Sequence, residues 1–291
     1  MANFSCSHLL FISFIIASGT LSVVSGTVFT IMNSCSFNVW PGILTGNGAQ
    51  LNDGGFLLAP GASVDVTAPA GWSGRIWGRT GCNFDGSGAG RCLTGDCGNK
   101  LKCAGAGGVP PVTLAEFTIG NGGGQDFYDV SLVDGYNVQM GITTRDGSGD
   151  CQNVGCVSDL NGSCPNELRV MDGGNVVACK SACAAFNKPE YCCTGAFDKP
   201  ETCPPTDYSR IFKAACPKAY SYAYDDASST FTCTNANYSV TNQVKSQKDF
   251  KCTRDIKCLR TMSICCSIDG FGIASTYKEF IQEQVHTKVE F

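Results

Sequence analysis

The chain has 291 residues, of which 43% are apolar and 16% are charged, and its formal net charge is −4. This length is enough to bury one large or two small hydrophobic cores. The sequence holds 20 Cys but only 2 His, and residues 27–285 contain no His, which excludes Ser-His-Asp or Cys-His nucleophiles and His-ligated metal sites from the body of the chain.

Residues 1–26 are expected to form a signal peptide. They carry no Lys, Arg, Asp or Glu, and an apolar run over residues 9–16, broken only by Ser13, is followed by small residues up to Gly26. A membrane anchor needs about 20 apolar residues, and polar or small residues at 18–20 interrupt the run too early. We therefore expect a soluble, secreted protein whose remaining Cys form disulfides rather than free thiols or metal ligands.

Short β-segments separated by Gly- and Pro-rich turns follow over residues 27–242, a pattern typical of a β-sandwich. The clearest segments are residues 28–31, 63–67, 113–119 and 127–133. Within the third, Ala115, Phe117 and Ile119 share one face while Glu116 points to the other. Glu116 is therefore predicted to place a carboxylate on the outer face of a core strand.

Two Cys-rich regions lack a clear strand pattern. Four Cys crowd a Gly-rich stretch within residues 80–111, and many more lie within residues 151–216. Short helices are expected at residues 181–187 and 207–215. Thr206 or Asp207 can cap the second helix, whose apolar stripe is expected to pack onto the body rather than bind a partner; it consists of Tyr208, Ile211, Phe212 and Ala215.

Strands are expected again over residues 231–241. The net charge of the chain is negative up to residue 242 and positive beyond it. Residues 27–242 carry 13 Lys and Arg against 19 Asp and Glu, whereas residues 243–291 carry 8 against 6. An acidic body argues against a nucleic-acid ligand. The basic block at residues 245–260 is interpreted as a solvated or poorly ordered tail rather than a lipid-binding patch.

The segment GAGRCLTGDC at residues 88–97, together with GRIWGRT at 74–80, resembles the plant thaumatin-like proteins of the osmotin and pathogenesis-related class. Similar matches extend the resemblance over about residues 27–241, although Asn99 stands where the family usually has a second Gly. These matches are TLAEF at 113–117, QDFYDVSLVDG at 125–135, YCC at 191–193, CPPT at 203–206 and AYSY at 219–222.

The resemblance implies a mainly β fold, with a flattened β-sandwich core over residues 27–79, 112–157 and 217–242. It also implies a small disulfide-held lobe at 80–111 and a larger disulfide-rich lobe at 158–216. The family's pairing, carried over position by position, implies seven disulfides: Cys82–Cys92, Cys97–Cys103, Cys151–Cys233, Cys156–Cys216, Cys164–Cys179, Cys183–Cys192 and Cys193–Cys203. Sequence alone does not choose among the many possible connectivities.

Antifungal members of the family share five polar residues that line a cleft between the sandwich and the larger lobe. The matching residues here are Arg75, Glu116, Asp129, Asp134 and Asp225. The resemblance implies a substrate-binding cleft for β-1,3-glucan or another fungal cell-wall polysaccharide, with no cofactor and no metal.

The residue types in this cleft suit a sugar polymer. Carboxylates accept hydrogen bonds from hydroxyls, Arg donates them, and aromatic rings such as those of Trp72, Phe84 or Tyr128 can stack on sugar rings. Clustered acids also raise the pKa of at least one member, as a general acid in glycoside hydrolysis requires.

For hydrolysis, the candidate catalytic residues are Glu116 as the acid and Asp129 or Asp134 as the base or nucleophile. The alternative is that the charges form a solvated network with Arg75 and perform no catalysis. Two sequons, at Asn161 and Asn237, are candidate glycosylation sites.

The leading hypothesis is therefore a secreted, monomeric plant defence protein of the apoplast or cell wall that binds β-1,3-glucan and cleaves it weakly or not at all. Two alternatives stay open: a membrane-permeabilising or receptor-directed defence protein acting through its surface without stable insertion, and an inactive variant with an altered C-terminus.

The C-terminus departs from the family. Gln243 stands where the resemblance places the Cys that pairs with the first Cys of the mature chain, here Cys35. Residues 243–291 show no resemblance to the family. They are interpreted as an atypical tail from a changed reading frame, a retained intron or an altered splice rather than as a functional extension. This tail holds four further Cys, at 252, 258, 265 and 266, any of which is a possible partner for Cys35.

Overall fold

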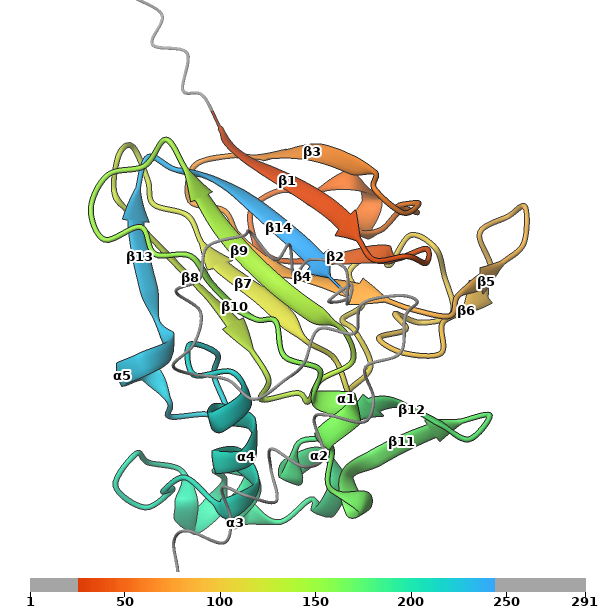
Figure 1. Ribbon diagram of the computed structural model, residues 1–291. Helices are drawn as coiled ribbons and strands as arrows, with labels where there is room; N and C mark the ends of the chain where they lie inside the picture. The colour runs from red at the N-terminus through yellow and green to blue at the C-terminus, as the bar shows by residue number, and fades with distance from the viewer. Residues whose placement is uncertain (1–25, 244–291) are drawn as a thin grey trace, which may run out of the picture. The chain divides into compact units, whose positions relative to one another are not determined.

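Residues 26–243 are described by the structure, a computed structural model shown in Figure 1. The signal peptide and the tail, for which the sequence makes separate predictions, lie outside these residues, except for Gly26 and Gln243 at their borders. No helix in the described part is long and apolar enough to cross a membrane.

Two five-stranded sheets stack face to face (Figure 1). The first has the order β10-β9-β14-β1-β3, in which only the pair of β1 with β14 is parallel. Its strands are β1 (Thr27–Ser34), β3 (Ser63–Ala68), β9 (Gln139–Arg145), β10 (Val154–Cys156) and β14 (Asn237–Gln243). The second is antiparallel throughout with the order β13-β8-β7-β4-β2. Its strands are β2 (Trp40–Asn47), β4 (Ser73–Arg79), β7 (Leu114–Thr118), β8 (Gln125–Ser131) and β13 (Phe231–Thr234).

An apolar core fills the space between the sheets, because alternate residues of each strand point inward. Phe29 of β1 packs 4.6 Å from Phe117 of β7 between ring centroids, and Tyr238 of β14 lies 5.2 Å from both Phe117 and Tyr128 of β8. All four rings are buried. The mainly β fold predicted from the sequence is thus confirmed.

A small excursion follows β4 and carries the hairpin of β5 (Asn83–Phe84) and β6 (Gly90–Arg91). The fully buried guanidinium of Arg79 joins this excursion to the sandwich, donating hydrogen bonds to the carbonyls of Trp40, Pro41, Lys100 and Leu101. These hydrogen bonds offset part of the cost of burying the cation, although burial still lowers the pKa of Arg79 to about 10. A short 3-10 helix, η1 (Asn52–Gly54), lies in the loop after β2.

The larger lobe between β10 and β13 is built of short elements. They are α1 (Leu160–Ser163), η2 (Asn166–Leu168), β11 (Arg169–Asp172), β12 (Asn175–Cys179), α2 (Ala182–Phe186), α3 (Pro189–Cys192), η3 (Gly195–Phe197) and α4 (Asp207–Ala215), with α5 (Asp226–Ser229) between the lobe and β13. The cap of α4 is Thr206, whose side chain accepts a hydrogen bond from the backbone N–H of Ser209. Both expected helices are therefore present, α2 within residues 181–187 and α4 at the predicted bounds.

Two details of the lobe differ from expectation. The hairpin β11–β12, closed by Gly173 and Gly174, was not predicted from the weak strand pattern. In α4, Ile211 is 39% exposed, whereas Phe212 is buried. Consecutive helical residues are about 100° apart. Ile211 therefore falls at the edge of the apolar stripe of this helix, which is centred near Phe212.

Residues 26–243 contain seven disulfides, between the same Cys partners that the family resemblance implies. Cys35 is buried beside Val39 and Val138 and has no disulfide partner among residues 26–243. Its neighbour Ser34 pairs with Gln243 in the parallel ladder of β1 and β14. The structure therefore brings position 243 next to Cys35 without a second thiol there.

Candidate functional site

Three charged side chains form a row across the outer face of the second sheet. Arg75 of β4 lies directly opposite Glu116 of β7, and Glu116 lies directly opposite Asp129 of β8. Their neighbours Ile76, Ala115 and Val130 point into the core, so strand alternation places all three charges on the other face. The predicted outward position of Glu116 is confirmed.

Arg75 is shared between two carboxylates. Its Nε lies 3.7 Å from Oε1 of Glu116, and its Nη1 lies 4.0 Å from Oδ2 of Asp134, which follows β8. The side chains of Arg75, Glu116 and Asp134 are 42%, 35% and 40% exposed, so solvent weakens both ion pairs. One cation is therefore shared by two carboxylates, with a third acid, Asp129, beside Glu116 on the sheet, and the site is open to a ligand.

Asp129 is the least solvated of these acids. Its Oδ1 atom is buried and has no hydrogen-bond partner. Burial, with the nearby charges of Glu116 and Asp226, raises the pKa of Asp129 to about 8. The carboxyl group of Asp129 therefore holds a proton at neutral pH.

Glu116 shows a smaller effect in the same direction. Burial is the main cause that raises its pKa; Arg75 opposes this, Asp134 adds to it, and a hydrogen bond with Ser131 opposes it. The electrostatics thus favour Asp129 over Glu116 as the proton donor, the reverse of the roles suggested by the sequence.

A cavity of about 270 Å³ opens over this row. Arg75, Glu116 and Asp129 line it together with Phe127, whose side chain is 46% exposed and which lies two residues before Asp129 on the same face. Phe127 was missed in the sequence analysis. The alternation of β8 could have revealed it, because a buried Tyr128 requires its neighbours to face outward.

The aromatic residues chosen from the sequence do not serve this cavity. Trp72 and Tyr128 are 0% and 1% exposed, and their polar atoms donate hydrogen bonds inside the fold, to Oγ1 of Thr45 and to the carbonyl of Gln152. Both rings belong to the core, so the expectation that they stack on sugars was wrong. Phe84 lies in the small excursion, 6.5 Å from the ring of Trp40 and beside the guanidinium of Arg79, and does not line the acidic cavity.

Within the described residues, Asp225 forms its ion pair and hydrogen bonds with Lys213, Ser221 and Ser228 and not with the other four predicted cleft residues. Its carboxylate lies 2.9 Å from Nζ of Lys213 and accepts hydrogen bonds from the N–H and hydroxyl of Ser221 and from the hydroxyl of Ser228. Burial raises the pKa of Asp225, but the hydrogen bonds from Lys213 and Ser221 outweigh it, so the net shift is downward. Asp226, the next residue, is the one whose charge acts on Asp129.

Both sequon asparagines have structural roles. Nδ2 of Asn161 is the atom that would carry a glycan, and it donates hydrogen bonds to the carbonyls of Asn137 and Val177. Oδ1 of Asn237 accepts a hydrogen bond from the N–H of Val28, where β14 begins. A glycan on Nδ2 of Asn161 would replace one of its two hydrogens, so at least one of these hydrogen bonds would be lost.

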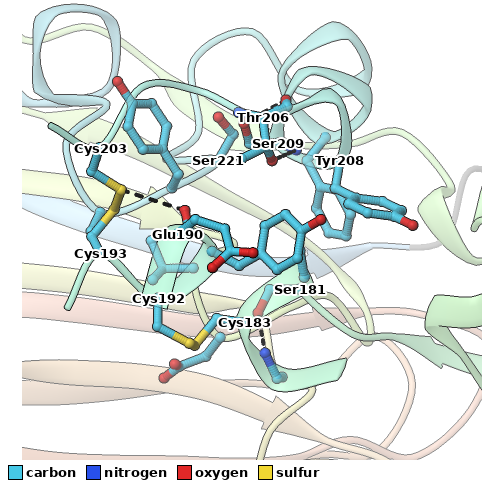
Figure 2. Close-up of a pocket in the computed structure, with 18 of the residues that line it drawn as sticks. Ser181, Cys183, Glu190, Cys192, Cys193, Cys203, Thr206, Tyr208, Ser209 and Ser221 are labelled. Atoms are coloured by element: carbon cyan, nitrogen blue, oxygen red, sulfur yellow. Dashed lines mark hydrogen bonds between the residues drawn. A yellow bond between two sulfur atoms is a disulfide. The ribbon is translucent and has the colours of Figure 1, made fainter. Parts of the chain in front are cut away.

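A larger cavity, of about 490 Å³, lies where the disulfide-rich lobe meets the end of β8 (Figure 2). Asp134 lines it from the sandwich side, and residues of α2, α3 and α4 line it from the lobe. The disulfides Cys183–Cys192 and Cys193–Cys203 are part of its lining. Within residues 26–243, no group of three or more His, Cys, Asp or Glu is arranged to hold a metal ion.

Residues 33–244 match the thaumatin family. The chain is 68% identical over 241 residues to pathogenesis-related protein 5 of Arabidopsis thaliana, an alignment that covers 83% of this chain and 99% of that protein. It is 49% identical over 236 residues to a glucan endo-1,3-beta-glucosidase of Prunus avium, which covers 78% of this chain and 96% of that protein.

Among solved structures, the fold is similar to that of a laminaripentaose-producing beta-1,3-glucanase in complex with laminaritetraose. The TM-score is 0.54 at 13% sequence identity, and the match covers 76% of this chain and 99% of that one. At this identity the likeness concerns the fold.

Proposed function

The chain belongs to the thaumatin family as a plant thaumatin-like protein, and from that premise we propose that it is a secreted defence protein that binds β-1,3-glucan of fungal cell walls in its acidic cavity. The observation that carries this proposal is the row of Arg75, Glu116 and Asp129 beside the exposed ring of Phe127.

This arrangement suits a neutral polysaccharide. Sugar hydroxyls donate to the carboxylates and accept from the Arg75 guanidinium, while the apolar face of a sugar ring can pack on Phe127. The acids are incompletely neutralised, so they are available to a ligand. An anionic polymer would be repelled by the same surface.

One relative supports the proposed role in defence, and another supports the proposed ligand. The name of the Arabidopsis relative refers to pathogenesis, which supports a role in defence. The name of the cherry relative refers to β-1,3-glucan, which supports the ligand class. Secretion is supported by the leader expected from the sequence and by seven disulfides, which persist in oxidising compartments.

Slow hydrolysis of the bound glucan is a second candidate activity, and the protonated state of Asp129 favours it. Glycoside hydrolysis needs an acid that still holds its proton at working pH and a second carboxylate that is ionised. Asp129 fits the acid, and Glu116 or Asp134 the second group. Release of reducing ends from a soluble β-1,3-glucan tests it: Asp129→Asn should abolish release while leaving binding measurable, and equal rates in both proteins would contradict this role.

Cosedimentation with insoluble β-1,3-glucan tests the binding proposal. We expect wild-type protein to cosediment and the Asp129→Ala, Asp134→Ala double variant to lose at least ten-fold in affinity. The lost hydrogen bond of the Asp134 carboxylate costs about 1.5–3 kcal/mol, and that of the protonated Asp129 costs about 0.5–1.5 kcal/mol. The matched control is Asp172→Asn with Glu201→Gln, which changes two exposed acids away from the cavity. Equal binding by wild type and the double variant would overturn the proposal.

A further inference from the structure

We propose that Asn237 carries an N-linked glycan whose first sugar lies in a cavity beside the glycine-rich loop at residues 120–124, and that the secreted protein carries no glycan on Asn161. Both asparagines begin sequons, at residues 161–163 and 237–239. The inference does not depend on whether the protein binds glucan, because no residue lines both this cavity and the acidic one.

The side-chain nitrogen of Asn161 is already used by the fold. Its Nδ2 donates hydrogen bonds to the carbonyl of Asn137 at 3.1 Å and to that of Val177 at 3.3 Å. Its Oδ1 is buried and has no hydrogen-bond partner. A sugar on Nδ2 would break at least one of the two donated bonds, and the remaining amide oxygen offers no compensation. The fold therefore opposes a glycan at Asn161.

Asn237 uses only its side-chain oxygen. Its Oδ1 accepts a hydrogen bond from the backbone N–H of Val28 at 2.8 Å, whereas within the described residues its Nδ2 has no hydrogen-bond partner. Asn237 is partly exposed and is the first residue of β14, where it pairs with the last residue of β9, Arg145. A glycan on Nδ2 therefore leaves the bond to Val28 intact and extends past the end of the sheet.

The space beside Asn237 suits a sugar. Asn237 lines a cavity of about 540 Å³, within the range of about 300–1,000 Å³ that is usual for small-molecule sites. Backbone rather than side chains forms much of its wall, because the lining includes Gly26, Gly120, Gly122, Gly123 and Gly124. A Cβ added at Gly122 would meet no atom within 4 Å. Within the described residues, the N–H groups of Gly122 and Gly123 have no hydrogen-bond partner, so both are available to sugar hydroxyls.

The sequon must be modified before β14 joins the sheet. The hydroxyl of Ser239 completes this sequon, but in the folded protein Ser239 is 5% exposed and accepts a hydrogen bond from the Arg145 guanidinium. β14 is the last described strand and lies between β1 and β9. It pairs only after most of the chain has been made, so the sequon remains open until then.

The transfer needs a donor that the secretory pathway of the host supplies, a lipid-linked diphosphate oligosaccharide. A bond forms between Nδ2 of Asn237 and C1 of the first sugar. The bond between C1 and the diphosphate breaks, the lipid diphosphate leaves, and Nδ2 loses one proton. The chain itself contributes the amide of Asn237 and the hydroxyl of Ser239.

Peptide mapping of the full chain secreted by plant cells tests the inference. Enzymatic release of N-glycans in oxygen-18 water converts each glycosylated Asn to a labelled acid. We expect the label at position 237 and none at position 161. Label at position 161, or an unmodified Asn237, would overturn the inference, whether or not the protein binds glucan.

Variants of the third sequon residue test the same inference through intact mass. Ser239→Ala should lose the whole mass of one glycan, whereas Ser163→Ala, which destroys the other sequon, should lose none. The matched control Ser239→Thr keeps the sequon and should keep the glycan. If Ser239→Ala fails to fold because it lacks the bond with Arg145, the mapping of the wild type and of Ser163→Ala still decides. Loss of a glycan from Ser163→Ala would contradict the assignment.

Nuclear magnetic resonance of the glycosylated protein tests the position of the first sugar. Nuclear Overhauser effects should connect this sugar to the amide protons of Gly122 or Gly123. A sugar that shows such effects only with other parts of the molecule would overturn its placement beside the loop.

Discussion

The sandwich and the disulfide-rich lobe of this protein are stabilised in different ways. Between the two sheets lies a continuous apolar core, in which the aromatic rings of Phe29, Phe117, Tyr128 and Tyr238 contact one another. The lobe, at residues 158–216, buries few large side chains. It contains three disulfides entirely within it, and a fourth, Cys156–Cys216, joins its last residue to β10 just before it. Packing therefore dominates in one region and cross-links in the other.

This difference is reflected in the functional site. Strand register aligns Arg75, Glu116 and Asp129 on the sandwich, so their spacing is as rigid as the sheet. The lobe cavity instead depends on short helices that the disulfides hold in place. The acidic cavity should consequently tolerate changes in the lobe better than the lobe cavity does.

Removing an aromatic ring from the sandwich core should have the largest effect. We expect Phe117→Ala to lower the free energy of unfolding by about 3–5 kcal/mol, through lost burial and the cavity left behind. Denaturant unfolding measures the change. The control is Phe127→Ala, ten residues along on the exposed face, which should cost less than about 1 kcal/mol. Equal losses would contradict the assignment of packing as the main support of the sandwich.

Giving the sandwich a cross-link of the kind that supports the lobe should have the next largest effect. Gln243→Cys places a thiol opposite Ser34 and next to Cys35, on strands about 4.8 Å apart, within the reach of a disulfide. The long loop it closes should add about 3–4 kcal/mol of stability. Mapping of non-reduced peptides should find Cys35 joined to position 243; a free Cys35 in the folded variant would refute the predicted geometry.

Cutting one bridge of the lobe should weaken the lobe alone. The pair Cys193→Ser and Cys203→Ser opens a ten-residue loop, and we expect a loss of about 2–3 kcal/mol in the local stability of residues 183–206. Hydrogen exchange should show faster exchange there and unchanged exchange in β7 and β8. Equal acceleration in both regions would mean that the lobe and the sandwich unfold as one unit.

The last predicted effect concerns a single proton, and its size depends on pH. The pKa of Asp129 is about 8 in the folded protein and about 3.9 in an unfolded chain. Between these values the folded state binds the extra proton, so stability falls as the pH rises from about 4 to 8. Asp129→Asn removes this dependence, and its melting temperature should exceed that of the wild type at pH 8 but not at pH 4. A difference that is the same at both pH values would contradict the raised pKa.

Parts of both regions could be predicted where the information is local. The alternation of Ala115, Phe117 and Ile119 placed Glu116 on the outer face, and the cap and stripe of α4 gave its exact bounds. The hairpin β11–β12 could not be predicted in the same way, since its strands are four and five residues long and only their turn, Gly173–Gly174, is distinctive.

The candidate site was harder to predict because it depends on tertiary structure. Sequence cannot distinguish Asp225, whose carboxylate binds Lys213, from Asp226, whose charge reaches Asp129. Nor can it assign the proton to Asp129 rather than Glu116, because burial decides between them. Tyr128 and Phe127 are adjacent aromatic residues, and only their inward or outward direction separates a core ring from a surface one.

The most direct test of the account is a crystal structure of the protein soaked with a β-1,3-linked glucose pentamer. The account predicts ordered sugar against Arg75, Glu116 and Phe127. Ordered sugar on another face of the molecule, with the row of Arg75, Glu116 and Asp129 still solvated, would contradict it.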